Sequence, residues 1–221
     1  MSVSIFTFTL LLKRKMFDNL QIDLTKVICH SGGAAGSDEQ WALIGKEYGI
    51  PTRAYSYKTK HHTSPDKVEI SDTDYAEGVV EIHKANKRLN RYGVHKYMNL
   101  LARNWSQVKY SNQTFAIGTI LKSGERGSKG YYNKSEYDVV DGGTGYCVQM
   151  SINHTHEVYV FDQIKDKWFR WSYIVSSFIE ITEVPCIIYE NFAGVGTREL
   201  HPNGLKAIRD VYEKTYKITI I

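Results

Sequence analysis

Strand-like and helix-like segments alternate along this chain of 221 residues, and that alternation constrains the fold more than any other feature. Apolar and β-branched runs predict strands at 27–31, 50–57, 113–120, 157–162 and 186–192. Apolar residues at helical spacing predict helices at 38–48, 72–91, 95–111, 146–153 and 205–217. Strands that alternate with helices form a mostly parallel sheet. We therefore expect an α/β fold, a Rossmann-like doubly wound sheet with helices on both faces.

Three further segments complete the expected architecture. Segment 165–172 is predicted to pair antiparallel with strand 157–162, turned at Asp166 and Lys167, which adds a small hairpin. The polar segment 58–71 and the glycine-rich segment 121–140 show no periodicity, so both are predicted to be loops, the second one flexible. A lid over an anionic ligand is the alternative interpretation of the basic residues in these loops.

The first 20 residues stand apart from this pattern. Their apolar run, Val3 to Leu12, is too short to span a membrane, and the basic residues 13–15 follow that run, whereas a secretory signal has its charge in front. We expect an N-terminal extension or an edge strand at 1–20, one domain at 21–221, and a cytoplasmic protein without membrane contact.

Glycine-rich stretches accompany three of the predicted strands, at 32–36, 142–145 and 194–196. In a doubly wound sheet, ligands bind outside the carboxyl ends of the strands, so the three stretches should gather at one rim. Glycine lets backbone N–H groups approach an anion closely, above all at the start of a helix. The pattern predicts an anion-binding rim, and the alternative is that each turn is tight only for packing.

Charge and cysteine content narrow the choice of ligand. The net charge of +4 is compatible with a small anion and argues only weakly for nucleic acid. The three cysteines are widely spaced and form neither a disulfide framework nor a zinc motif. Nothing in the sequence calls for a metal or a cofactor.

The candidate ligand-binding residues are the glycines of these turns, their hydroxyl-bearing neighbours, two arginines and one tyrosine that could stack on an aromatic ligand. Ser37 could equally be a helix N-cap, and both arginines could simply lie at the surface. The candidates are Ser31, Gly32, Gly33, Gly36, Ser37, Arg53, Tyr55, Gly142, Gly143, Thr144, Gly145 and Arg198.

Two motifs resemble the SLOG superfamily, the Rossmann-like family of DNA-processing protein A and the Lonely Guy enzymes. One is "SGGAAGSD" at 31–38, followed by a helix. The other is "DGGTGYCVQMSINHTHEVYVFDQIKDKWFRW" at 141–171, which is similar to the glycine turn, helix and next strand of these proteins. The resemblance covers 26–171, and it implies a nucleotide-type ligand for a SLOG-like domain at 21–221. Because superfamily members are often dimers or larger, it also implies a homo-oligomer.

The second motif departs from the Lonely Guy pattern, G-G-x-G-T-x-x-E, in which the glutamate is catalytic. Tyr146 stands where the family has threonine, and Gln149 stands where it has glutamate. A glutamine cannot act as a carboxylate base, although its amide can hydrogen-bond a ribose or a base. If the protein is an enzyme, the candidate catalytic carboxylates are Asp38, Asp141 and Glu199.

Three functions therefore stay open, and whether the protein is an enzyme is undecided. The first is binding of a nucleotide, ADP-ribose or NAD-type ligand by a sensor or sequestering protein, which Gln149 favours. The second is hydrolysis of an N-glycosidic bond in a nucleotide, as a phosphoribohydrolase. The third is DNA binding like that of DNA-processing protein A, which requires a contiguous basic stripe and which the modest charge disfavours.

Overall fold

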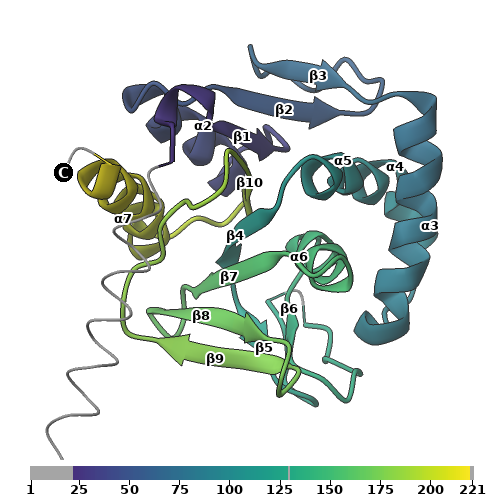
Figure 1. The fold of residues 1–221 in the computed structure, drawn as a ribbon. Coiled ribbons are helices and arrows are strands. Elements are labelled where there is room, and N and C mark those ends of the chain that lie inside the picture. The colour runs from purple at the N-terminus through teal and green to yellow at the C-terminus, as the bar shows by residue number, and fades with distance from the viewer. Residues whose placement is uncertain (1–21, 129, 220–221) are drawn as a thin grey trace, which may run out of the picture.

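The computed structural model describes residues 22–128 and 130–219, and Figure 1 shows their arrangement. The extension or edge strand expected at 1–20 lies outside the described residues. Among the residues that are described, no helix combines the length and the apolar character that a membrane crossing requires.

One large sheet of eight strands organises the molecule, in the order β3-β2-β1-β10-β4-β7-β8-β9. The first six of these strands are parallel, and β8 and β9 are antiparallel additions at one edge. The strands are β1 (Ile28–Ser31), β2 (Thr52–Ser56), β3 (Lys67–Glu69), β4 (Gln113–Gly118), β7 (Glu157–Asp162), β8 (Lys167–Ser172), β9 (Ser177–Ile181) and β10 (Asn191–Gly196). A separate antiparallel pair joins β5 (Ile120–Leu121) to β6 (Val139–Val140).

Helices cover both faces of the large sheet (Figure 1). The helices are η1 (Leu24–Lys26), α2 (Ser37–Glu47), α3 (Asp72–Leu89), η2 (Val94–Tyr97), α4 (Met98–Ala102), α5 (Asn104–Lys109), α6 (Thr144–Asn153) and α7 (Pro202–Thr219). One apolar core lies under α2 and α7, around Trp41 and Tyr212, and the other lies under α3, α5 and α6, around Ile82 and Met150. The mostly parallel, doubly wound α/β sheet is therefore confirmed.

The predicted hairpin is also confirmed. Strand β8 pairs antiparallel with β7, and Asp166 in the turn has a φ of 55°. Alternation along β8 sends Trp168 into the core under α2 and α7, whereas Trp171 packs in the core on the opposite face. The two tryptophans lie in different cores because successive side chains of a strand point to opposite faces of the sheet.

The last strand differs from its prediction. Strand β10 occupies 191–196 instead of 186–192, so Gly194 and Gly196 lie inside a strand and not in a turn. The reason is packing, because β10 lies between β1 and β4, and a Cβ atom on Gly194 would be 2.6 Å from Cγ of Trp41. These glycines allow α2 to approach the middle of the sheet.

Other differences come from tertiary contacts that periodicity does not show. The loop predicted at 58–71 contains β3, and no strand was predicted at 177–181, where β9 forms an edge of the sheet. The helix expected at 95–111 is divided into η2, α4 and α5. The loop expected to be flexible at 121–140 contains β5 and β6, and Asn133 within it is buried and bonded to the carbonyls of Leu121 and Tyr137.

Candidate functional site

The first glycine turn follows β1 and leads into α2. Gly33 and Gly36 have φ angles of 60° and 95°, a region that favours glycine. The hydroxyl of Ser31 donates to the carbonyl of Gly194 at 2.7 Å, and the hydroxyl of Ser37 donates to the carbonyl of Thr197 at 2.8 Å. Both serine hydroxyls therefore join the turn to β10 and the residue after it.

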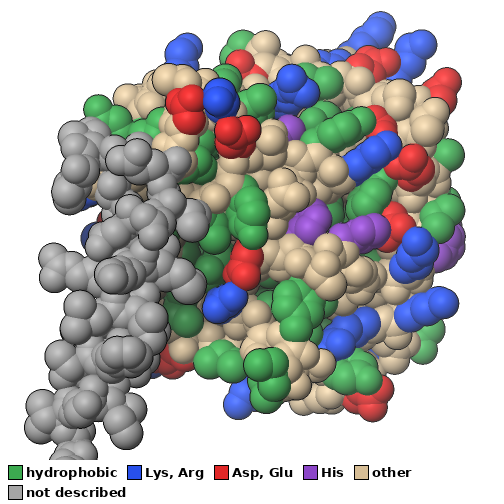
Figure 2. All heavy atoms as spheres, viewed as in Figure 1, with side chains coloured by type: hydrophobic (Ala, Val, Ile, Leu, Met, Phe, Trp, Pro, Cys, Tyr) green, Lys and Arg blue, Asp and Glu red, His purple; other side chains and the backbone are tan. Residues whose placement is uncertain are grey.

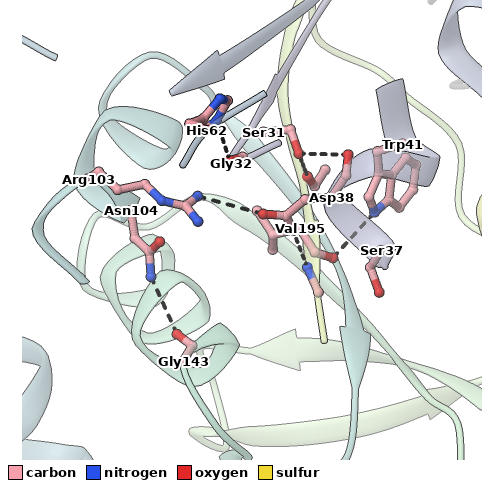
Figure 3. Close-up of polar contacts among 12 residues, drawn as sticks. Ser31, Gly32, Ser37, Asp38, Trp41, His62, Arg103, Asn104, Gly143 and Val195 are labelled. Carbon is pink, nitrogen blue, oxygen red and sulfur yellow. Dashed lines mark hydrogen bonds and ion pairs between the residues drawn. The ribbon is translucent and has the colours of Figure 1, made fainter. Parts of the chain in front are cut away.

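A buried ion pair lies beside this turn, as Figure 3 shows. Arg103, between α4 and α5, approaches Asp38 of α2 with 3.6 Å between Nη1 and Oδ2, and the two side chains are only 7% and 8% exposed. A Cβ atom on Gly32 would lie 1.4 Å from Nη1 of Arg103, so the guanidinium rests directly on the backbone of the turn. Only glycine leaves room for it.

Asp38 is held by several partners inside the protein. Its Oδ1 accepts a hydrogen bond from the N–H of Gly196 at 3.0 Å, and its other oxygen faces Arg103. Burial raises the pKa of the Asp38 carboxyl, and the charge of Arg103 opposes that rise. The arrangement is that of a carboxylate that fixes an arginine, not of an exposed acid or base.

Two side chains that the sequence analysis did not select complete the first turn. The hydrogen-bond network orients the Gln107 amide so that its oxygen accepts from the N–H of Gly32 at 2.6 Å and from Arg103. His62, from the loop before β3, places Nε2 3.0 Å from the carbonyl oxygen of Gly32. Burial lowers the pKa of the His62 ring, so the neutral ring is favoured here.

The second glycine turn leads into α6 and is more open than the first. Gly142 and Gly143 are exposed, Gly142 has a φ of 64°, and Thr144 is half-buried. Gly143 is the N-cap of α6 and offers no side-chain cap. Within the described residues, the N–H groups of Gly143 and Thr144 have no hydrogen-bond partner. This helix therefore begins with unpaired donors that face solvent.

Positive and polar side chains support this second turn. The guanidinium of Arg91 donates to the carbonyls of Gly142 and Val140, the latter at 2.6 Å. The amide of Asn104 donates to the carbonyl of Gly143 at 3.4 Å, and Asn104 is the residue after Arg103 (Figure 3). The two turns are therefore joined through the start of α5.

Asp141 and Gly145, at the second turn, make contacts with other residues of the protein. One oxygen of Asp141 accepts from the N–H of Gly142, and the other accepts from the N–H and hydroxyl of Ser128 at 2.9 and 2.8 Å. A Cβ atom on Gly145 would lie 2.1 Å from the carbonyl oxygen of Val140, so this glycine is needed for packing.

The third stretch meets the first turn through backbone contact. The ideal Cβ position on Gly36 lies 2.5 Å from the carbonyl oxygen of Arg198. Arg198 and Glu199 are exposed, and the carbonyl of Glu199 accepts from Gln163 at 3.0 Å. The third stretch therefore contacts the first turn through the residues that follow the β10 glycines, not through a glycine turn.

Other candidates lie away from the two turns. Tyr55 is buried, its hydroxyl lies 3.0 Å from Nδ1 of His30, and its ring stacks against the rings of His30 and Tyr110. Arg53 is exposed on the same strand. Gln149 is buried in α6, and its amide nitrogen donates to Asn153, one turn further along the helix. The side chains of Tyr55 and Gln149 therefore bond or stack with other residues of the protein and do not point to a ligand site.

Arg103 is the main residue that the sequence analysis missed. A single arginine in a predicted helix carries no local pattern, but the stretch around it does. Residues 82–124 contain eight Lys and Arg residues and no Asp or Glu. That stretch includes Arg91, Arg103 and Asn104, the side chains that support the two turns.

Comparison of the chain with models of known protein families, with curated proteins and with solved structures finds no match. The similarity to the SLOG superfamily therefore rests on the two motifs alone. The evidence on function is therefore the geometry of the two glycine turns and the residues that support them.

Proposed function

We propose that the protein binds a nucleotide-derived small molecule, such as a nucleotide, ADP-ribose or an NAD-type ligand, and that its phosphate sits at the second glycine turn. The observation that carries the proposal is the open start of α6. Gly143 and Thr144 present unpaired N–H groups to solvent, and no side chain caps them. Unpaired donors at a helix start, together with the helix dipole, attract phosphate.

The first turn is less suited to the phosphate itself. Its serine hydroxyls donate to backbone carbonyls, and the Asp38 carboxylate lies against it. The N–H of Gly32 is bonded to the amide oxygen of Gln107, so this turn has fewer free donors for a phosphate. We infer that the first turn positions Arg103 and, through Asn104, supports the second turn.

Binding without chemistry is the better supported form of the proposal. Asp38 is buried against Arg103, and Asp141 is occupied by Ser128 and Gly142. Glu199 is exposed, and only its backbone is held. Asp141 lies at the start of α6, but both of its oxygens are bonded within the protein, to the N–H of Gly142 and to Ser128, which supports a sensor or sequestering protein over a hydrolase.

The test combines binding and product analysis. We would titrate the protein with AMP, ADP-ribose, NAD and ribose 5-phosphate by calorimetry and analyse each mixture for products by mass spectrometry. Gly143→Val should abolish binding and leave the fold intact, because Gly143 has φ −63° and its Cβ would lie 3.8 Å from the nearest atom, in Leu101. The control is Ala76→Val on the exposed face of α3, which adds bulk away from the turn.

Two outcomes would contradict the proposal. Unchanged affinity in a folded Gly143→Val variant would remove the phosphate site from α6. Release of free base or ribose phosphate by the unmodified protein would replace binding with hydrolysis of the glycosidic bond.

A further inference from the structure

Three exposed tyrosines lie beside the second glycine turn. Tyr92 and Tyr131 are each 80% exposed, and Tyr132 is 60% exposed. Large aromatic side chains that remain in water, grouped with positive charge, are typical of surfaces that bind a partner. We call Tyr92, Tyr131 and Tyr132, with the exposed cations Arg126 and Lys134, the tyrosine surface.

Specific contacts tie the tyrosine surface to the second turn. Tyr92 directly follows Arg91, whose guanidinium holds the carbonyl of Gly142. On the other side, Arg126 and Tyr132 form a β-bridge, and Ser128 between them is bonded to Asp141, the residue before Gly142. Both parts of the surface are therefore one side chain away from the start of α6.

The loop that carries Tyr131 and Tyr132 is anchored. The buried Asn133 bonds to the carbonyls of Leu121 and Tyr137, and the hydroxyl of Ser135 donates to the carbonyl of Arg88 in α3. The amide of Asn90 donates to the carbonyl of Lys134. These bonds fix the backbone next to Tyr132, so the loop itself need not be ordered when a ligand arrives, which reduces the entropy cost of binding.

Charge on this side of the molecule suits an anionic ligand with a flat ring. Nζ of Lys134 lies 4.9 Å from the centroid of the Tyr92 ring. Figure 2 shows basic side chains on the face in view over the C-terminal part of α3, the end of the helix that leads to Tyr92. A tyrosine face stacks on a nucleobase of any identity, and a nearby cation favours the attached phosphate.

We propose that the tyrosine surface receives the base of the nucleotide whose phosphate lies at the start of α6. This inference rests on the proposed function and deepens it, because it assigns the base to a place on the protein. It implies that the ligand is a nucleotide with an accessible base, and that recognition of the base by stacking tolerates more than one base.

The test separates the base from the phosphate. Calorimetry would compare AMP with ribose 5-phosphate, which has no base, on the unmodified protein and on a Tyr92→Leu/Tyr131→Leu/Tyr132→Leu variant. Stacking is worth roughly 1–3 kcal/mol per base, so AMP affinity should fall by about fivefold or more, whereas ribose 5-phosphate should bind as before. A Tyr189→Leu/Tyr216→Leu variant, which removes two exposed tyrosines elsewhere, should bind AMP normally.

The outcomes distinguish this inference from the proposed function. If Gly143→Val abolishes AMP binding but the triple variant binds AMP normally, the phosphate site stands and the base site is wrong. If the unmodified protein binds none of AMP, ADP-ribose, NAD and ribose 5-phosphate, both proposals fail. Tighter binding of a single-stranded oligonucleotide than of AMP, lost in the triple variant, would assign the tyrosine surface to nucleic acid and overturn the inference.

Discussion

Arg103 shows how one side chain can connect two parts of a site. Its guanidinium rests on the backbone of Gly32, its charge is paired with Asp38, and the next residue, Asn104, reaches the second turn. A buried ion pair is weak evidence for stability by itself, because desolvation offsets the attraction between the charges. Here the ion pair fixes the position of the guanidinium, because the Asp38 carboxylate holds it against the backbone of Gly32.

The coupling between Asp38 and Arg103 can be measured. Arg103→Met should lower the free energy of unfolding by about 3–5 kcal/mol, because it leaves Asp38 charged, buried and unpaired. Adding Asp38→Asn should restore part of that loss, since the amide oxygen can still accept from Gly196. Urea denaturation at neutral pH of both single variants and the double variant gives the coupling. Losses that simply add would contradict it.

Gly194 tests the packing explanation for the strand glycines. Gly194→Ala should destabilise the protein by roughly 1–3 kcal/mol, because the new methyl group would lie 2.6 Å from Trp41 in a filled core. Tryptophan fluorescence during chemical denaturation would report the loss of stability. Gly143→Ala is the matched control, with the nearest atom 3.8 Å away, and a similar loss in both variants would count against the packing argument.

His156 should make stability depend on pH. Burial, with the charge of His154 as a smaller cause, lowers the pKa of this ring from 6.5 to about 4. The folded protein therefore favours the neutral ring, and stability is lost as pH falls from 6.5 towards 4, because the unfolded chain takes up the proton first. In denaturation curves across this pH range, His156→Leu should flatten the slope, and an unchanged slope would refute the assignment.

At the level of whole elements, sequence periodicity predicted the helices and strands whose positions depend mainly on their own local sequence. The alternation of strands and helices indicated a doubly wound sheet, and α2, α3, α6 and β7 form near their expected positions. Elements whose position depends on distant partners were missed or displaced. Strand β10 begins five residues later than predicted because its neighbours in the sheet decide where pairing starts, and β3 and β9 are edge strands supported by one neighbour each.

The same distinction applies to the candidate site. The glycine turns could be found from the sequence because glycine itself carries the information, and two of the three do begin helices beside the rim. Arg103, Gln107 and His62 could not be found, because nothing in their local sequence says that they fold against Gly32. Tyr55 was selected by its place at a strand end, but its ring packs against His30.

The start of α3 offers a test of element stability. The hydroxyl of Ser71 accepts a hydrogen bond from the N–H of Asp74 at 3.0 Å and caps the helix. Ser71→Ala should cost about 1 kcal/mol, measured by chemical denaturation. Ser123→Ala, at an exposed loop position, should have little effect, and equal effects would mean that the cap does not stabilise α3.

At the scale of the whole molecule, charge is distributed unevenly. Residues 82–124 carry eight positive charges and no negative ones, and since the chain has a net charge of +4, the remaining residues together carry −4. The positive stretch includes the second half of α3, together with α4 and α5, which border the second turn. Lys84, Arg103 and Lys109 form ion pairs with carboxylates outside this stretch, so the positive field near the second turn comes from the remaining cations, Arg91 among them.

This field should make ligand binding sensitive to salt. The Debye length is about 10 Å at 0.1 M salt and 3 Å at 1 M, so the contribution of surface cations falls as salt rises. AMP affinity measured by calorimetry should decrease about threefold or more between 0.05 and 0.5 M sodium chloride. An affinity independent of salt would mean that the cations of residues 82–124 do not act on the ligand.

The position of β10 has a consequence for how the protein is made. Among the eight strands of the large sheet it is the last to leave the ribosome, yet it lies between β1 and β4. Until residue 196 has been synthesised, the nascent chain has no strand to join β1 to β4, and each presents an open edge. Native assembly of the sheet therefore waits until translation has passed β10, and during that interval the growing polypeptide depends on chaperones or on speed to avoid aggregation.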